Sequence, residues 1–227
     1  MLGLRVFMAL SVKYDLLIEQ VDVISAFLQS DLEEQIFMEV PGGIQYSGEK
    51  VCLLLKSLYG LKQSPRAWNQ KLHSFLITLG FTQSKTDYCV YYLHSSNIEN
   101  NFYVLIFVDD ILLITKSQDR LNAFKTKLKN SFEITDAQPL SYFLGIRFDR
   151  DESNIYMSQK AYLEDLLEKA NMDECRRTPS TPLEIKIDTD ELTSNNTEIN
   201  QKYPCRNIIG SLMYAMLCTR PDLCYAV

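Results

Sequence analysis

The hydrophobic pattern at the start of the chain predicts a buried amphipathic helix. Apolar residues recur at helical spacing within residues 1–12. The positions expected to face inward are Leu2, Val6, Ala9 and Leu10. The same run imitates the apolar core of a signal peptide, but Arg5 interrupts it and no small-residue cleavage site follows. We therefore expect this segment to stay in the folded protein as a helix.

Further along, short apolar runs bounded by turn residues predict strands. They fall at residues 15–24, 88–94, 102–108 and 111–115, and a later hairpin joins residues 142–149 to 154–158. Residues 51–55 form another short apolar run. The first of these strands ends near Asp22, which gives that carboxylate a defined position at a strand end.

Helices are predicted between and after these strands. The clearest spans residues 64–79, with Ser64 as N-cap, Pro65 at the first helical position and Gly80 as the stop. A second helix is expected at residues 120–130, with Leu121, Phe124 and Leu128 facing inward. A third is expected at 160–170, with Leu163, Leu166, Leu167 and Ala170 facing inward. Further helices are expected at 207–218 and from 220 onward, and residues 31–34 look like the capped start of another.

This order of elements predicts an α+β fold, with an antiparallel sheet and helices packed on one of its faces. A doubly wound fold would need strands and helices in strict alternation, and residues 88–115 break that order. Residues 178–202 are rich in Ser, Thr, Asn and acids, which indicates an exposed linker.

Composition supports a folded protein. Apolar residues make up 46% of the 227 positions and charged residues 23%, which is ordinary for a globular chain. The six cysteines include no C-x-x-C pair, and only two histidines are present, so free thiols in a reducing compartment are favoured over structural zinc. No run of 18 apolar residues exists, so we expect no membrane partner.

The net charge of −6 argues against an evenly basic nucleic-acid binder. The charge is uneven, however: residues 50–86 hold six basic residues and no acid, and residues 116–130 hold five basic residues against Asp119. The acidic excess lies mostly in residues 133–198. A local field can attract an anion that the net charge would repel. The basic helix at 120–129 can equally be a solvated face.

Two adjacent acids interrupt the apolar residues 102–115. Asp109 and Asp110 repel each other, which raises their pKa values unless a cation neutralises them, and Mg²⁺ prefers such oxygen ligands. The alternative is a plain hairpin turn, where Asp is common. Asp22 favours a cation site over a plain turn, because a third carboxylate beside the pair could complete a two-metal site for in-line phosphoryl transfer.

Five segments then resemble, in order, the reverse transcriptases of copia-type retrotransposons. They are QVDVISAFL at 20–28, KSLYGLKQSPRAW at 56–68, FVDD at 107–110, YFLGI at 142–146, and IGSLMY at 209–214 followed by TRPD at 219–222. The resemblance covers essentially the whole chain. It implies a reverse-transcriptase palm with incomplete fingers and thumb.

The resemblance also implies roles for individual residues. Asp22, Asp109 and Asp110 would be the catalytic acids and, with the Val23 carbonyl, would hold two Mg²⁺ ions, with Mn²⁺ as a substitute. The nucleotide-binding set would be Ser25, Ala26, Phe27, Tyr59, Gly60 and Lys62, with Phe27 under the sugar selecting dNTPs. The nucleic-acid contacts would be Arg66, Val108, Phe143, Leu144 and Gly145. For Phe27 the alternative interpretation is a buried core position. Trp68 is expected to be a core residue of its helix, with a base-stacking platform as the alternative.

By the same resemblance, residues 1–158 would form the palm, 159–177 the start of a thumb-like region, 178–202 the linker and 203–227 helices leading towards a ribonuclease H domain. The expected partners are an RNA or DNA template with its primer, dNTPs and the other polyprotein domains. The fingers segment, ribonuclease H, protease and integrase are not matched, so weak activity is expected of this chain alone. The expected location is the cytoplasm, in a virus-like particle, with the nucleus as a second site.

Three other functions remain open at this point. The chain could be a non-enzymatic relic or co-opted domain that binds nucleic acid. It could be a palm of another nucleotidyl-transfer class, which residues 56–68 argue against. It could also be an interaction module in which the acid pair is a plain turn.

Overall fold

The computed structural model describes residues 2–44, 50–97, 100–175, 180–183 and 205–227. These residues divide into two compact units, 2–140 and 141–227, which are described separately. No helix among the described residues has the length and apolarity needed to cross a bilayer.

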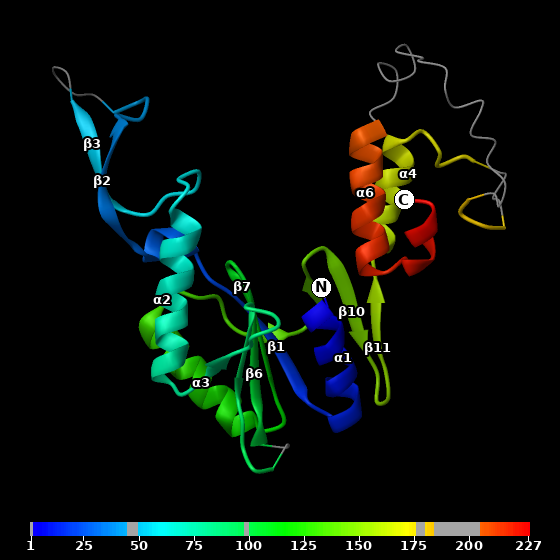
Figure 1. Ribbon diagram of the computed structural model, residues 1–227, viewed down its shortest axis with the longest axis horizontal. Helices are drawn as coiled ribbons and strands as arrows, with labels where there is room; N and C mark the ends of the chain where they lie inside the picture. Colours follow the sequence, from blue (N-terminus) through cyan, green and yellow to red (C-terminus); the bar gives the residue numbers. More distant parts are fainter. Residues whose placement is uncertain (1, 45–49, 98–99, 176–179, 184–204) are drawn as a thin grey trace. The chain divides into compact units, whose positions relative to one another are not determined.

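The first unit is built on a six-stranded antiparallel sheet in the order β4-β5-β6-β7-β1-β8 (Figure 1). Its centre consists of β6 (Phe102–Phe107), β7 (Asp110–Thr115) and β1 (Leu17–Asp22). The outer strands are β4 (Thr82–Gln83), β5 (Val90–Leu93) and β8 (Gln138–Pro139). The predicted central strands are confirmed, and the short β4 and β8 are additions to the prediction.

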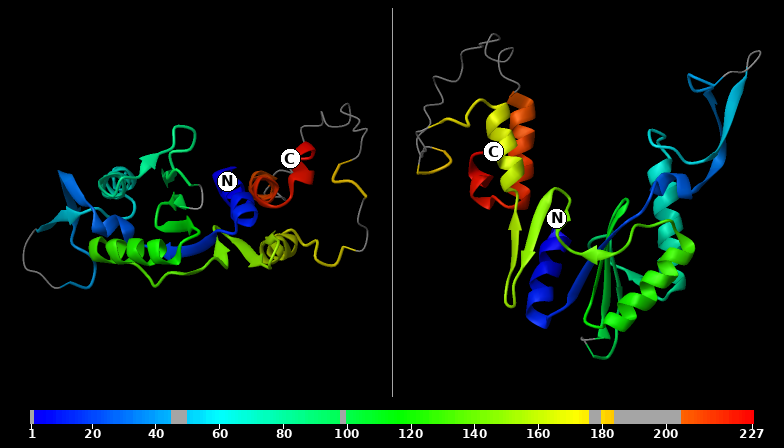
Figure 2. Two further views of the ribbon diagram at one scale, coloured as in Figure 1. Left: turned by 90° about the horizontal axis from the view of Figure 1, so that it is seen from below. Right: turned by 180° about the vertical axis from the view of Figure 1, so that it is seen from behind.

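Helices cover both faces of this sheet, whereas one covered face was predicted. On one face, α2 (Ser64–Thr78) and α3 (Gln118–Ser131) bury Trp68, Leu72 and Leu76 against Leu121, Phe124 and Leu128. On the other face lies α1 (Leu2–Tyr14) (Figure 2). There the centroid of the Phe7 ring lies 5.1 Å from that of Tyr103. The prediction of a single helical layer was therefore wrong.

The inward face of α1 also differs from the prediction. The buried positions are Leu4, Phe7, Met8 and Ser11, whereas Val6 is 48% exposed. The segment has apolar residues around most of its circumference, so helical spacing alone left the choice of face open. The sheet surface that receives Phe7 decides it.

The cap of α2 differs slightly from the prediction. Gln63 is the N-cap, and Ser64 is the first helical residue. The Ser64 hydroxyl donates to the Leu58 carbonyl at 2.6 Å, so it fixes the preceding loop rather than the helix end. Gly80, with φ of +87°, follows the helix as predicted.

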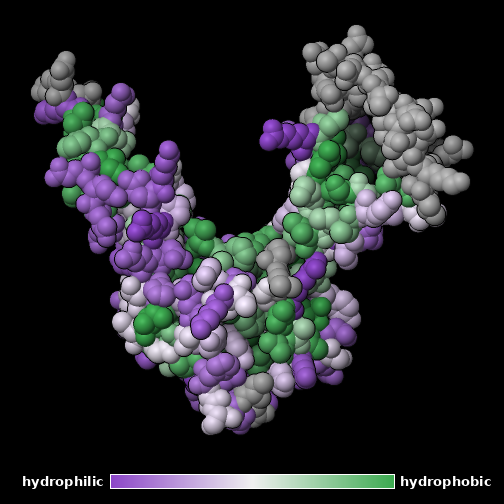
Figure 3. All heavy atoms as spheres, in the orientation of Figure 1, coloured by the Kyte–Doolittle hydropathy of each residue, from purple (hydrophilic) through white to green (hydrophobic). Residues whose placement is uncertain are grey.

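The segment predicted as a helical start at 31–34 is instead a strand. It belongs to β2 (Asp31–Glu39), which pairs with β3 (Val51–Lys56) as a two-stranded ribbon after the short 3₁₀ helix η1 (Ala26–Gln29). Long-range pairing with an apolar run outweighs the local capping signal here. Figure 3 shows apolar side chains at the surface of this ribbon, which carries exposed Phe37, Val51, Leu53 and Leu55.

Within its described residues, the second unit contains a three-stranded sheet and three helical segments. The strands are β9 (Tyr142–Phe143), β10 (Ile146–Arg150) and β11 (Ile155–Ser158), and the helices are α4 (Lys160–Lys169), α6 (Cys205–Cys218) and the 3₁₀ helix η4 (Pro221–Tyr225). The predicted strand at 142–149 is broken by a turn at Leu144 and Gly145, both with positive φ. The hairpin between β10 and β11 is confirmed.

Two further predictions for this unit need comment. α4 buries none of its side chains fully, and Leu167 is 46% exposed, so its predicted inward position was wrong. Most of the predicted linker at 178–202 lies outside the described residues. The structure divides the chain at 140/141 rather than near 158, and the assignment of the parts to palm and thumb stays a prediction.

Candidate active site

Asp109 lies on a two-residue turn between the central strands β6 and β7, and Asp110 is the first residue of β7. Phe107 pairs with Asp110, which leaves Val108 and Asp109 as the turn. Val108 has φ of +58°, a conformation that is unfavourable for a β-branched residue. Such a turn persists only where its surroundings hold it. The plain-turn geometry is therefore present, but with a strained residue at its tip.

A core side chain holds the turn from below. The Trp68 indole N–H donates to the Val108 carbonyl at 2.7 Å, and Trp68 itself is 2% exposed. Its ring packs edge-on against Phe132. The prediction that Trp68 is a core residue is confirmed. Its hydrogen bond to the turn was not predicted, because a contact between residues 40 positions apart has no local sequence signal.

Asp22 reaches the same end of the sheet from the neighbouring strand. It is the register partner of Asp110, and the Val23 N–H donates to the Asp109 carbonyl at 2.9 Å. Thr135 fixes Asp22 from the other side, donating its N–H to the Asp22 carbonyl and accepting the Asp22 N–H on its hydroxyl. Segments 87 residues apart in sequence, at 22 and 109, thus bring their carboxylates together.

The electrostatics of these acids are those of crowded anions. Burial raises the pKa of the Asp22 carboxyl, and the charge of Asp109 raises it further. Burial also raises the pKa of Asp110, with added repulsion from Asp109 and then Asp22. Within the described residues, none of the three carboxylates pairs with a Lys or Arg. A bound cation would relieve this repulsion.

The aromatic pair Phe27 and Tyr59 adjoins the acids. The Tyr59 hydroxyl donates to Asp109 Oδ2 at 3.3 Å, and its ring centroid lies 4.5 Å from that of Phe27. Burial raises the pKa of the Tyr59 phenol, as do the charges of Asp109 and Asp22, so it stays a proton donor. Phe27 is 8% exposed and belongs to the core, while Tyr59 is 58% exposed. Phe27 is therefore a core residue whose ring also packs against Tyr59, the residue that donates to Asp109.

The turn before η1 positions Ser25 and Ala26. Ser25 has φ of +50° and is exposed, whereas Ala26 is fully buried. The Ser25 carbonyl accepts the Leu28 N–H at 2.8 Å. Val23 is buried and forms an isolated bridge with Ile134. The predicted phosphate contacts of Ser25 and Ala26, and the Val23 carbonyl as a metal ligand, stay predictions.

Three lysines that were not singled out from the sequence share a hollow with Ser25. Lys56, Lys71 and Lys129 line a depression of about 960 Å³ together with Ser25 and Glu133. Lys56 pairs with Asp31, Lys129 with Asp136, and Lys71 donates to the Gln29 carbonyl. The sequence signal for this hollow was the pair of basic segments at 50–86 and 116–130, because these segments contain all three lysines.

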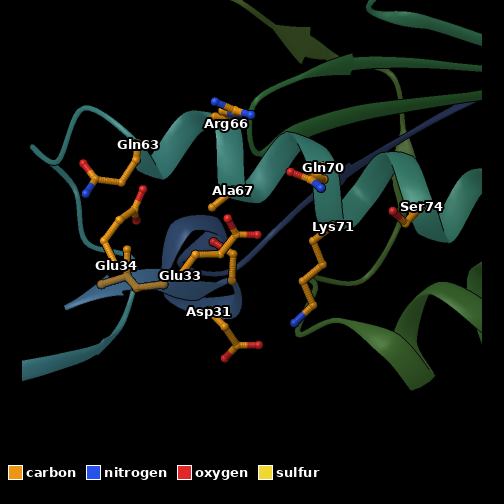
Figure 4. Close-up of a pocket in the computed structure, with 11 residues that line it drawn as sticks. Asp31, Glu33, Glu34, Gln63, Arg66, Ala67, Gln70, Lys71 and Ser74 are labelled. Atoms are coloured by element: carbon orange, nitrogen blue, oxygen red, sulfur yellow. The ribbon is translucent and has the colours of Figure 1, made fainter. Parts of the chain in front are cut away.

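The other predicted contact residues on this unit lie in more mixed surroundings. Lys62 is exposed, and Gly60 has φ of +98° with open space where a side chain would be. Arg66 lines a pocket of about 350 Å³ between α2 and β2, where three acids, Asp31, Glu33 and Glu34, form the opposite wall (Figure 4). These acids reduce the positive potential near Arg66.

The remaining predicted residues, Phe143, Leu144 and Gly145, lie in the second unit. Phe143 is buried, and the Leu144 carbonyl accepts the Tyr214 hydroxyl. Gly145 has φ of +73°, and a Cβ there would lie 2.5 Å from that hydroxyl. The turn therefore requires glycine. A role in binding nucleic acid stays a prediction.

The arrangement of the carboxylates meets only part of what a metal site requires. Among the described residues, no group of three or more His, Cys, Asp or Glu side chains is arranged to hold a metal ion. Asp22 and Asp109 nevertheless interact closely enough for one to raise the pKa of the other. Asp110 as a third ligand stays a prediction.

The comparisons with known proteins agree with this geometry. Residues 2–185 match the family "Reverse transcriptase (RNA-dependent DNA polymerase)". The chain is 40% identical, over its full length, to the retrovirus-related Pol polyprotein from transposon TNT 1-94 of Nicotiana tabacum, of which it covers 18%. It is 35% identical over 99% of its length to the Pol polyprotein from transposon RE1 of Arabidopsis thaliana, of which it covers 15%.

A shorter relative also matches. The putative transposon Ty5-1 protein YCL074W of Saccharomyces cerevisiae is 27% identical over 91% of the chain, which covers 66% of it. The chain thus spans less than a fifth of the two Pol polyproteins it resembles at 35–40% identity. Its family-model match covers the acids, the aromatic pair and the Trp68 helix together. The chain belongs to the reverse transcriptase family and is similar to the corresponding region of copia-type retrotransposon Pol polyproteins.

Proposed function

We propose that this chain carries the polymerase centre of an RNA-directed DNA polymerase. The observation that carries the proposal is the meeting of Asp22 with the Asp109-Asp110 turn at one end of the sheet, beside Tyr59 and Phe27. The substrates would be dNTPs and a primer annealed to an RNA or DNA template. The primer 3′-oxygen would bond to the α-phosphorus of the nucleotide as the bond to pyrophosphate breaks.

Asp22 and Asp109 would hold two divalent cations, Mg²⁺ or Mn²⁺, with Asp110 and the Val23 carbonyl completing the site. The raised pKa values of Asp22 and Asp110, and the lack of a basic partner for any of the three acids among the described residues, fit a cation there. When bound, such ions activate the 3′-hydroxyl and stabilise charge on the triphosphate. Tyr59 would orient the Asp109 carboxylate through its hydroxyl, because that hydrogen bond fixes one of the two oxygens.

The lysine-lined hollow beside Ser25 supports a path for phosphates. Lys56, Lys71 and Lys129 line it on the side of η1 where Ser25 is exposed. Asp31 and Asp136 pair with Lys56 and Lys129 and reduce their charge, whereas Lys71 donates to a backbone carbonyl and keeps its own. Polyphosphates and nucleic-acid backbones are attracted by such charge. Phe27, next to Tyr59 and Asp109, would meet the nucleotide sugar and disfavour a 2′-hydroxyl there.

Primer extension on two RNA templates of different sequence tests the proposal. With Mg²⁺ and dNTPs, we expect products complementary to each template, and a loss of about 10³-fold in rate for Asp109→Asn. Asp173→Asn, which changes an exposed acid in the second unit, should extend as the wild type does. Extension that survives Asp109→Asn, or products independent of template sequence, would contradict the proposal.

A further inference from the structure

A small apolar pocket lies behind the Val108-Asp109 turn, between α2 and the strands β5 and β6. It has a volume of about 240 Å³. Its walls include the aromatic side chains of Trp68, Tyr88, Tyr91 and Phe107, together with Asn69 and Cys89. None of the lining residues carries a charged side chain. All lie in the first unit.

The lining defines the chemistry of a ligand. Aromatic walls favour another ring, which can pack against them edge-on or offset. The polar side-chain groups of the lining are the Asn69 amide, the Cys89 thiol and the hydroxyls of Tyr88 and Tyr91, and the Tyr91 hydroxyl already pairs with His73 Nδ1 at 2.9 Å. Burial raises the pKa of the Cys89 thiol, and the nearby Asp87 raises it further, so the thiol stays neutral. An ion would lose its hydration here without gaining an opposite charge.

The size of the pocket further limits the class of ligand that it can bind. Apolar cavities of about 150 Å³ in proteins stay dry and bind benzene. The pocket here is large enough for one substituted ring, and too small for most drug-sized ligands, whose sites begin at about 300 Å³. A nucleobase would bury several polar edge groups for which these walls provide few partners.

We propose that this pocket is a binding site for a small uncharged aromatic molecule. Its position gives the site a consequence for the turn. Trp68 and Val108 are both walls of the pocket, and the Trp68 N–H donates to the Val108 carbonyl. A ligand against the indole would therefore restrain the turn that carries Asp109. The binding site itself stands on the cavity and does not depend on the proposed polymerase function.

Trp68 makes binding directly measurable, because it is the one tryptophan in the chain. We would titrate the metal-free protein with bromobenzene, whose bromine quenches indole emission on contact. Trp68 is 2% exposed, so a quencher that stays in water reaches it poorly. We expect saturable quenching by bromobenzene at one molecule per chain. Iodide at the same concentrations should quench weakly.

Two pocket-filling variants, each with a matched control, decide whether Trp68 reports on this pocket. Asn69→Phe places a ring at the exposed rim, and Gln70→Phe makes the same change one position along α2, outside the pocket. Cys89→Met lengthens a side chain that lines the pocket, and Cys52→Met makes the same change on the β2–β3 ribbon, outside the pocket. Circular dichroism verifies that each variant folds.

We expect the affinity for bromobenzene to fall about tenfold or more in Asn69→Phe and Cys89→Met, since a few heavy atoms decide binding in a small apolar site. Gln70→Phe and Cys52→Met should bind as the wild type does. Quenching that stays linear with concentration would overturn the proposal. So would equal affinity in the folded pocket variants and their controls.

Discussion

Among the individual residues, Trp68 has two roles that the sequence alone separated poorly. Its helical spacing predicted a core position, and the structure confirms it. The same residue donates to the Val108 carbonyl and so supports the turn that carries Asp109. Val108 adopts a positive φ that a β-branched residue disfavours, which makes an external support necessary. A hydrogen bond of this kind depends on how α2 packs, and residue spacing does not encode it.

Trp68→Phe separates the two roles. The change keeps an aromatic core side chain but removes the donor to the Val108 carbonyl, and the loss of one such hydrogen bond costs about 0.5–1.5 kcal/mol. We expect the free energy of unfolding to fall by that amount in thermal or urea unfolding. Phe81→Leu provides a matched loss in the same core, away from the turn. Mn²⁺ affinity should fall in Trp68→Phe and not in Phe81→Leu; an equal fall in both would show that Trp68 acts only as core.

The crowded carboxylates predict an unusual pH dependence. The folded-state pKa of Asp110 is raised above its ordinary value of 3.8, so the folded state binds this proton more tightly than the unfolded state. Stability is therefore highest below pH 3.8 for this group, and part of it is lost as the pH rises through the raised pKa. Asp22 acts in the same direction.

Asp110→Asn should consequently stabilise the metal-free protein at pH 7. We expect its melting temperature to rise by about 1–3 °C relative to the wild type, with a smaller difference near pH 3. Asp173→Asn, the exposed control, should change little at either pH. Addition of Mg²⁺ should narrow the gap, because a cation relieves the same repulsion in the wild type. A lower melting temperature for Asp110→Asn at pH 7 without metal would refute this explanation.

Among the elements, the sequence predicted best those whose signals are local. The helix α3, with Leu121, Phe124 and Leu128 buried, follows from spacing alone, whereas its cap at Ser117, ahead of the predicted start at residue 120, was not predicted. The predicted helical start at residues 31–34 was wrong because these residues pair with β3, and the sequence of β2 alone does not signal that long-range pairing. The second helical layer on the sheet could have been inferred: β7 runs Ile-Leu-Leu-Ile without alternation and is buried on both faces.

The Leu144-Gly145 turn provides an element-scale prediction. Gly145→Ala requires an unfavourable φ of +73° and places a Cβ 2.5 Å from the Tyr214 hydroxyl that donates to Leu144. Gly43→Ala shares the positive φ, at +94°, but meets open space. We expect Gly145→Ala to lower the unfolding free energy by about 1–3 kcal/mol more than Gly43→Ala. Hydrogen exchange at residues 141–158 would locate the loss; equal losses would mean that the clash is relieved by movement of Tyr214.

On the scale of the whole chain, the net charge of −6 was a poor guide to the site. Lysines from three separate elements, at 56, 71 and 129, line one hollow with Ser25, although acids pair with two of them. Motif order identified the family over essentially the full chain, and the family match confirms it. What the order of motifs could not provide is the support around the acids: Thr135 beside Asp22, Tyr59 on Asp109 and Trp68 under Val108.

The central claim is that Asp22 and Asp109, from two distant segments, form one cation site. Electron paramagnetic resonance of free Mn²⁺ measures binding directly and needs neither template nor dNTP. We predict that Asp22→Asn and Asp109→Asn each weaken Mn²⁺ binding by about tenfold or more, since each removes a charged oxygen ligand. Asp173→Asn should bind as the wild type does. Equal affinity in the wild type and Asp22→Asn would contradict the account, because the acid pair would then be only a turn.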